Sequence, residues 1–152
     1  MKKIIPELIN IFQITLFKSI VTATPEYLEK PIKPGNVRVD ISQSSAFNFE
    51  QKNIRVRLEI HLNGLDAEDH LIGIQGDFGL EFHFHIENLE EFTEETDEIK
   101  KVNSILGSTL ISIAYSTARG IVFERTQGTL LTGIILPVID PKDVLRDGKE
   151  EF

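Results

Sequence analysis

The strict alternation of apolar and polar residues between Asn53 and Leu62 constrains the fold more than any other feature of the sequence. Charged residues and a histidine separate branched aliphatic residues at every second position, which are Ile54, Val56, Leu58, Ile60 and Leu62. A period of two places each set on its own face of a β-strand. The segment is therefore predicted to be a strand with one buried face.

The same alternation resumes after a polar interval. Asn63-Gly64 and the polar residues 66–69 predict a turn, and apolar residues then recur from Ile72 to Ile86. Two such runs around a turn predict an antiparallel hairpin. Glycines at positions 73, 76 and 79 interrupt the second strand, so a bend and a curved, twisted sheet are expected.

Two further strands are expected nearer the N-terminus. Phe12, Ile14 and Leu16 share a face until Phe17 breaks the phase, as the extra residue of a bulge would, and residues 37–41 alternate again. Three prolines and a glycine lie between these strands, in residues 25–35. They are expected to exclude helix and central strand, which leaves a crossover packed on the fold.

The C-terminal part has a helical pattern. An acidic segment over 87–98 is followed by an apolar stripe, with Thr96 or Thr93 as the expected N-cap and Gly128 as the expected stop, which predicts one helix over 97–126. A short helix is expected from Pro141 to Leu145. The fold class is therefore α+β: a curved four-stranded antiparallel sheet with a Pro-rich crossover, one long C-terminal helix packed on the sheet and a short final helix, in a single domain over 1–152.

A ridge of small residues runs along one face of the predicted long helix. It repeats every fourth position, at Ser104, Ser108, Ser112, Ser116 and Gly120. Solvated helix faces usually carry Lys and Glu, which this ridge lacks. A helix–helix seam between subunits is the preferred interpretation, and a solvent-facing serine row is the alternative.

Composition limits the partners and the location. The 152 residues carry a net charge of -8, which opposes a nucleic-acid backbone and favours basic polypeptides. No run reaches the about 20 consecutive apolar residues of a membrane span. Glu7, Asn10, Gln13 and Lys18 interrupt the apolar N-terminus too often for a secretory signal. With no cysteine, the chain needs no oxidising compartment, and a cytoplasmic location is expected.

The sequence offers little evidence for catalysis. His83 and His85 share a polar strand face with Glu81 and Glu87, and His61 could join them to hold Zn or another divalent ion. Exposed polar strand residues are the preferred explanation. No nucleophile motif is present, so no enzyme activity, cofactor or metal is predicted. The acidic segment is more simply a solvated surface than a docking site.

Several short motifs, in order, resemble one chaperone family. Phe12-Gln13-Ile14, residues 37–41, the glycine-bearing stretch 71–82, Ala118-Arg119, and Gly128-Thr129 followed by Pro137-Val138 resemble the SecB export chaperones along nearly the whole chain. The resemblance implies an ATP-independent chaperone that holds unfolded polypeptides in apolar grooves. It also implies a homo-oligomer, a dimer of dimers, with the long helices at the contact, which the small ridge fits. The implied client contacts are Tyr27, Leu28, Ile32, Val39, Ile41, Leu71 and Phe78.

The chain departs from the family at the positions that dock the SecA translocation motor. By alignment these acidic positions fall on Ser19, Ala23 and Gly73, so motor docking is not expected. We therefore expect clients to be delivered by another route. The clients would be preproteins or one dedicated protein such as an antitoxin. An adaptor that binds one folded partner through the acidic segment is the alternative, and a metal-dependent enzyme is the third hypothesis.

Overall fold

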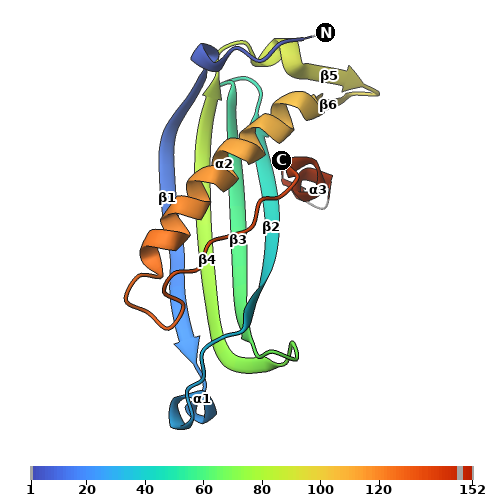
Figure 1. Ribbon diagram of the computed structural model, residues 1–152. Helices are drawn as coiled ribbons and strands as arrows, with labels where there is room; N and C mark the ends of the chain where they lie inside the picture. The colour runs from blue at the N-terminus through green and yellow to red at the C-terminus, as the bar shows by residue number, and fades with distance from the viewer. Residues whose placement is uncertain (1, 147–148, 152) are drawn as a thin grey trace.

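The computed structural model describes residues 2–146 and 149–151 and contains the predicted antiparallel sheet (Figure 1). Its long strands are β1 (Ile9–Ala23), β2 (Asn36–Asn48), β3 (Asn53–Leu65) and β4 (Leu71–Ile86), in the order β1-β4-β3-β2. A short strand that the sequence did not predict, β7 (Lys149–Glu151), adds parallel to β2 at the edge. The α+β class with four long antiparallel strands is confirmed.

The β3–β4 hairpin forms because the apolar residues of both strands face the core side of the sheet. Leu58 pairs with Leu80 and Val56 with Phe82, and all four side chains are buried. The predicted turn at Asn63-Gly64 is wrong by a few residues, because both belong to β3. The chain reverses over 66–70 instead, where the Asp66 carboxylate accepts hydrogen bonds from two backbone N–H groups. These bonds lower the pKa of Asp66, with the bond from His70 as the main cause.

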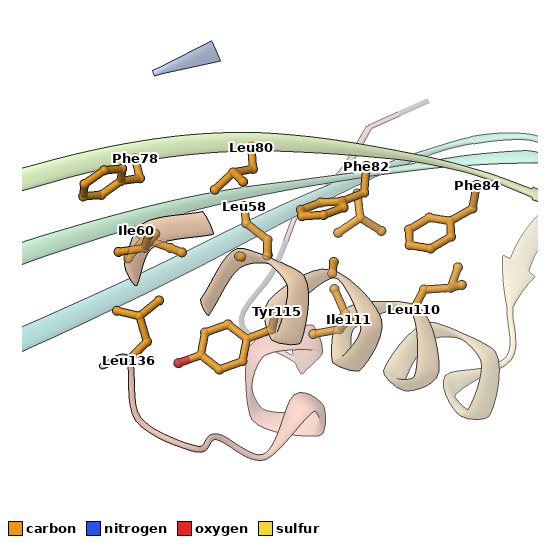
Figure 2. Packing of buried hydrophobic residues seen from close by; sticks show 14 of the residues in the cluster. Leu58, Ile60, Phe78, Leu80, Phe82, Phe84, Leu110, Ile111, Tyr115 and Leu136 are labelled. Atoms are coloured by element: carbon orange, nitrogen blue, oxygen red, sulfur yellow. The ribbon is translucent and has the colours of Figure 1, made fainter. Parts of the chain in front are cut away.

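Helix α2 (Ser104–Arg125) lies across the inner face of the sheet (Figures 1 and 2). Seven of its side chains are buried, namely Leu106, Leu110, Ile111, Ala114, Tyr115, Ala118 and Val122. They pack on the phenylalanine and leucine side chains of β3 and β4. Among the helices described, α2 is the one whose length and composition would allow it to cross a membrane, a test that a buried core helix also passes.

The predicted start of the long helix is wrong. Residues 93–102 form a hairpin, β5 (Thr93–Thr96) and β6 (Ile99–Val102), after a 3-10 turn, η2 (Leu89–Phe92). Glu94 faces Lys101 and Glu95 faces Lys100, and these opposite-charge pairs favour strand pairing. The N-cap is therefore neither Thr93 nor Thr96: the Asn103 side chain accepts a bond from the N–H of Ile105.

The crossover contains a helix that the prolines were expected to exclude. Helix α1 (Pro25–Glu29) begins with Pro25, a position whose N–H would have no helical partner, and Thr24 caps it. Tyr27 anchors the crossover because its ring is buried and its hydroxyl donates to the Ile32 carbonyl oxygen at 2.9 Å. The rest of the crossover has no regular structure, as predicted.

Strand β1 carries two bulges. Its register with β4 shifts between Ile11 and Gln13 and again between Leu16 and Lys18, so Phe12 and Phe17 are the extra residues. The bulge at Phe17 is confirmed, and the one at Phe12 was not predicted. A 3-10 turn, η1 (Pro6–Leu8), precedes the strand, and the short final helix is α3 (Pro141–Arg146).

Candidate functional site

An open groove of about 620 Å³ lies between the start of β2 and the segment that follows α2. One wall comes from residues 33–37 and Val39, and the other from residues 130–135 and Pro137. Val, Leu and Ile side chains lie on both walls, beside Lys33, Asn36 and Thr132. A groove of this volume could hold several side chains of an extended peptide.

The second wall is the tail, which we define as residues 127–140, and it has no helix or strand. The tail leaves α2 through Gly128, whose φ of 77° is a conformation that glycine adopts without strain. Leu131 and Leu136 are buried and anchor the tail to the core. Gly76 of β4 makes this packing possible, because a Cβ atom there would lie 2.9 Å from Leu131 Cδ1.

Two side chains of α2 hold the far end of the tail. The Tyr115 hydroxyl donates to the Pro137 carbonyl oxygen at 2.5 Å, and Arg119 Nε donates to the Leu136 carbonyl oxygen at 3.0 Å. Figure 2 shows Tyr115 and Leu136 together beneath the sheet. Burial raises the pKa of Tyr115, so its hydroxyl keeps the proton that it donates.

The two hydrogen bonds from Tyr115 and Arg119 to the tail, which we call the clamp, leave other tail side chains exposed. Ile135 is 70% exposed and Val138 is 84% exposed, and Leu130 also has a large exposed area. Side chains of this size usually turn inward when the chain can bury them. The tail therefore presents an apolar strip beside the groove.

The predicted client contacts do not form one cluster. Val39 lines the groove, Ile41 is the next inward residue on β2 and is half-buried, and Ile32 is exposed beside the groove wall at Lys33. Leu28 is exposed on α1, and Leu71 is exposed at a separate depression of about 390 Å³ that Thr24 and Glu26 also line.

Two of the predicted contacts belong to the core. Phe78 is 1% exposed and Tyr27 is also buried, so neither presents surface to a client in this conformation. Residues of the tail, which the sequence analysis did not include, take their place in the groove: Leu130, Ile134, Ile135 and Pro137. The available signal was an apolar stretch from 130 to 139 with no regular alternation.

The predicted small ridge lies on an accessible face of α2. Ser104, Ser112, Ser116 and Gly120 are exposed and Ser108 is half-buried. A Cβ atom at Gly120 would meet no atom within 4 Å. The ridge is therefore open to a partner, and the seam remains a prediction.

Strand β1, at one edge of the sheet, carries exposed apolar side chains on both of its faces. Ile11, Phe12, Ile14, Phe17 and Ile20 all have a large exposed fraction. Edge strands with unpaired backbone groups are templates for pairing with another chain. This edge is therefore a candidate contact between subunits.

The histidines of β3 and β4 are engaged in separate pairs. His61 contacts Asp77, His85 Nδ1 lies 2.9 Å from Asn53 Oδ1, and His83 lies 3.5 Å from Glu81. Glu81 accepts two hydrogen bonds from Arg57, which lower its pKa. Within residues 2–146 and 149–151, no group of three or more His, Asp or Glu side chains is arranged to hold a metal ion.

Comparison with solved structures identifies the fold. A SecB-like chaperone of Mycobacterium tuberculosis, Rv1957, solved with a ChAD peptide from the Rv1956 HigA1 antitoxin, superposes with a TM-score of 0.64 at 16% identity, over 88% of this chain and 91% of that chain. A protein of unknown function from Streptococcus agalactiae matches at a TM-score of 0.41 and 13% identity, over 86% of this chain and 97% of that one. No family model and no curated protein matches the sequence. The chain has a SecB-like fold.

Proposed function

We propose that this chain is an ATP-independent chaperone that binds unfolded or nascent polypeptides in the groove between β2 and the tail. The observation that carries the proposal is the open groove with aliphatic side chains on both walls, within a SecB-like fold. Apolar contacts depend little on the order of residues in a client, which suits a protein that holds many sequences.

The character of the client follows from charge and from the structural neighbour. A net charge of -8 favours basic polypeptides. The neighbour's complex with an antitoxin peptide supports a polypeptide client, and we extend this to a preprotein or a dedicated client such as an antitoxin. Residues 19, 23 and 73, where the family carries acidic docking residues, are Ser, Ala and Gly, which argues against a SecA-type motor as the delivery partner.

The proposed chaperone is a cytoplasmic homo-oligomer without a catalytic role or a cofactor. Two accessible surfaces support self-association, the apolar edge of β1 and the small ridge of α2. Pairing through one surface and then the other would build a dimer of dimers, because each two-fold contact uses its own patch.

Light scattering of an aggregating unfolded protein, with and without this chain and without ATP, tests the proposal. The mass of the chain is determined in the same buffer. We expect stoichiometric suppression by an oligomer, with no further effect of ATP. Absence of suppression would contradict the proposal, and salt-sensitive binding of one folded partner would favour an adaptor that acts through the acidic segment 87–98.

A further inference from the structure

The inward face of β2 changes character halfway along the strand. Val37, Val39 and Ile41 are apolar, but the next two inward residues are Gln43 and Ser45. Gln43 is 6% exposed and Ser45 is 4% exposed. Burial of an amide or hydroxyl is costly unless a hydrogen bond replaces the lost water. These two polar residues therefore need an explanation that the groove does not provide.

The hydrogen bond between Gln43 and Ser45 uses only part of their hydrogen-bonding capacity. The Ser45 hydroxyl donates to Gln43 Oε1 at 2.9 Å. Gln43 Nε2 carries two further donor hydrogens, and none of the described residues offers it an acceptor within hydrogen-bond distance. Gln43 Nε2 is not fully enclosed, so its donor hydrogens remain accessible from the space beside the side chain.

Gln43 and Ser45 line a cavity of about 190 Å³ between β2, β3 and helices α2 and α3. Phe47 and Ser104 also line it, and Leu145 of α3 covers one side. Gly107 lets this cover approach, because a Cβ atom there would lie 3.1 Å from Leu145 Cδ2. An apolar cavity of about 150 Å³ holds one benzene molecule, so this cavity has room for a single ring with a small substituent.

We propose that this cavity binds a small neutral molecule with a compact apolar body, the size of one ring, and one carbonyl oxygen that accepts from Gln43 Nε2. The described lining residues are all uncharged. Among these described residues a carboxylate would lose its water without gaining a cation, which disfavours an acid relative to an amide or ketone. The site is separate from the groove and does not depend on the proposed chaperone function.

Titration of the isotope-labelled full chain with benzamide, followed by NMR, tests the assignment. We expect saturable shifts of the Gln43 side-chain amide and of the backbone of Ser45, Gly107 and Leu145. Benzoate and toluene should bind about tenfold more weakly, because each lacks one property of the ligand class. Absence of saturable shifts, shifts centred on residues 130–137, or equal binding of benzoate would each overturn the proposal.

A double variant, Gln43→Leu with Ser45→Ala, removes the polar pair. It should fold, because replacing both partners by apolar groups leaves no orphaned donor, and it should bind benzamide about tenfold more weakly while retaining toluene. Gln43→Met, which has similar size and cannot donate, should show the same loss of benzamide binding. Gln51→Leu is the matched control, since Gln51 is exposed in a turn. Unchanged benzamide binding in either Gln43 variant would exclude the site.

Discussion

The ring of Phe17 lies against Gly79, so closely that a Cβ atom on Gly79 would sit 2.3 Å from Phe17 Cε2. The bulge in β1 makes this contact possible, because Phe17 is the extra residue between the pairs Leu16–Leu80 and Lys18–Gly79. The Arg57 guanidinium lies 5.0 Å from the centre of the same ring. The bulge, the glycine and the cation thus form one local unit on the outer face of the sheet.

Gly79→Ala should lower the free energy of unfolding by about 1–3 kcal/mol, because the new methyl group displaces the Phe17 ring. Urea denaturation measures the change. Gly120→Ala is the matched control: its methyl group meets nothing, so helix propensity should raise stability by up to about 1 kcal/mol. Adding Phe17→Ala should recover part of the loss from Gly79→Ala. Equal stability of the Gly79→Ala variant and the original chain would contradict the contact.

Arg119→Leu should loosen the tail. The Leu136 carbonyl group loses its donor, at a cost of about 1–3 kcal/mol. Hydrogen exchange should show faster exchange of the amides around Ile134 to Leu136 than in the original chain. Arg125→Leu serves as the control because, among the described residues, the ion pair of Arg125 is an exposed one with Glu124, and this variant should change stability by less than about 0.5 kcal/mol. Similar exchange in both variants would rule out the clamp.

Ile135→Asp should weaken client binding by about tenfold, because it places a carboxylate on the apolar wall of the groove. The measurement is the affinity for a labelled unfolded polypeptide, with thermal unfolding to verify the fold. Ile99→Asp makes the same change at an exposed apolar residue on β6, away from the groove. If both variants bind the client equally well, the groove is not the client site.

Glu81→Gln should destabilise the protein near pH 7, and the destabilisation should shrink as the pH falls through the folded-state pKa of Glu81. The hydrogen bonds from Arg57 hold the pKa of Glu81 below the ordinary value of a glutamate. The stabilisation is therefore present above the unfolded pKa and is lost as pH falls through the lower folded pKa. Melting temperatures measured across this range test the direction, with the exposed Glu124→Gln as the control. A pH-independent difference would show that the ion pair is not the cause.

Ser112→Arg should reduce the oligomer mass if the small ridge forms a seam, because a long charged side chain prevents close approach of two helices. Light scattering coupled to gel filtration measures the mass. Ser42→Arg places the same side chain at an exposed position on β2. A mass unchanged by Ser112→Arg would return the ridge to the alternative of a solvent-facing serine row.

The strands could be predicted because a period of two is coupled directly to burial. Ile54 to Leu62 and Ile74 to Ile86 alternate in sequence, and their exposure alternates in the structure except at Gly79, which is also buried. The start of the helix could not be predicted in the same way. The acidic residues predict a first helical turn, whereas cross-strand Glu–Lys pairs and positive φ angles at Asp97 and Glu98 form a hairpin there.

Of the two walls of the groove, only the one formed by β2 could be predicted from the sequence. Val39 lies on a regular strand, whose inward positions follow from its pattern. Ile135 lies in a segment without regular structure, and its exposure depends on hydrogen bonds from Tyr115 and Arg119 to its neighbours. Phe78 shows the reverse error, since alternation placed it on the inner face but could not reveal that α2 and the tail cover that face.

The two walls of the groove lie far apart in the order of synthesis. The first wall, residues 33–39, emerges early from the ribosome, and the second, residues 130–137, emerges only after the whole of α2. During translation the chain can pair its strands before it has any groove. Under the proposed function, capture of a client would wait until the tail has docked, and the growing chain would not meet a finished groove while it is still being made.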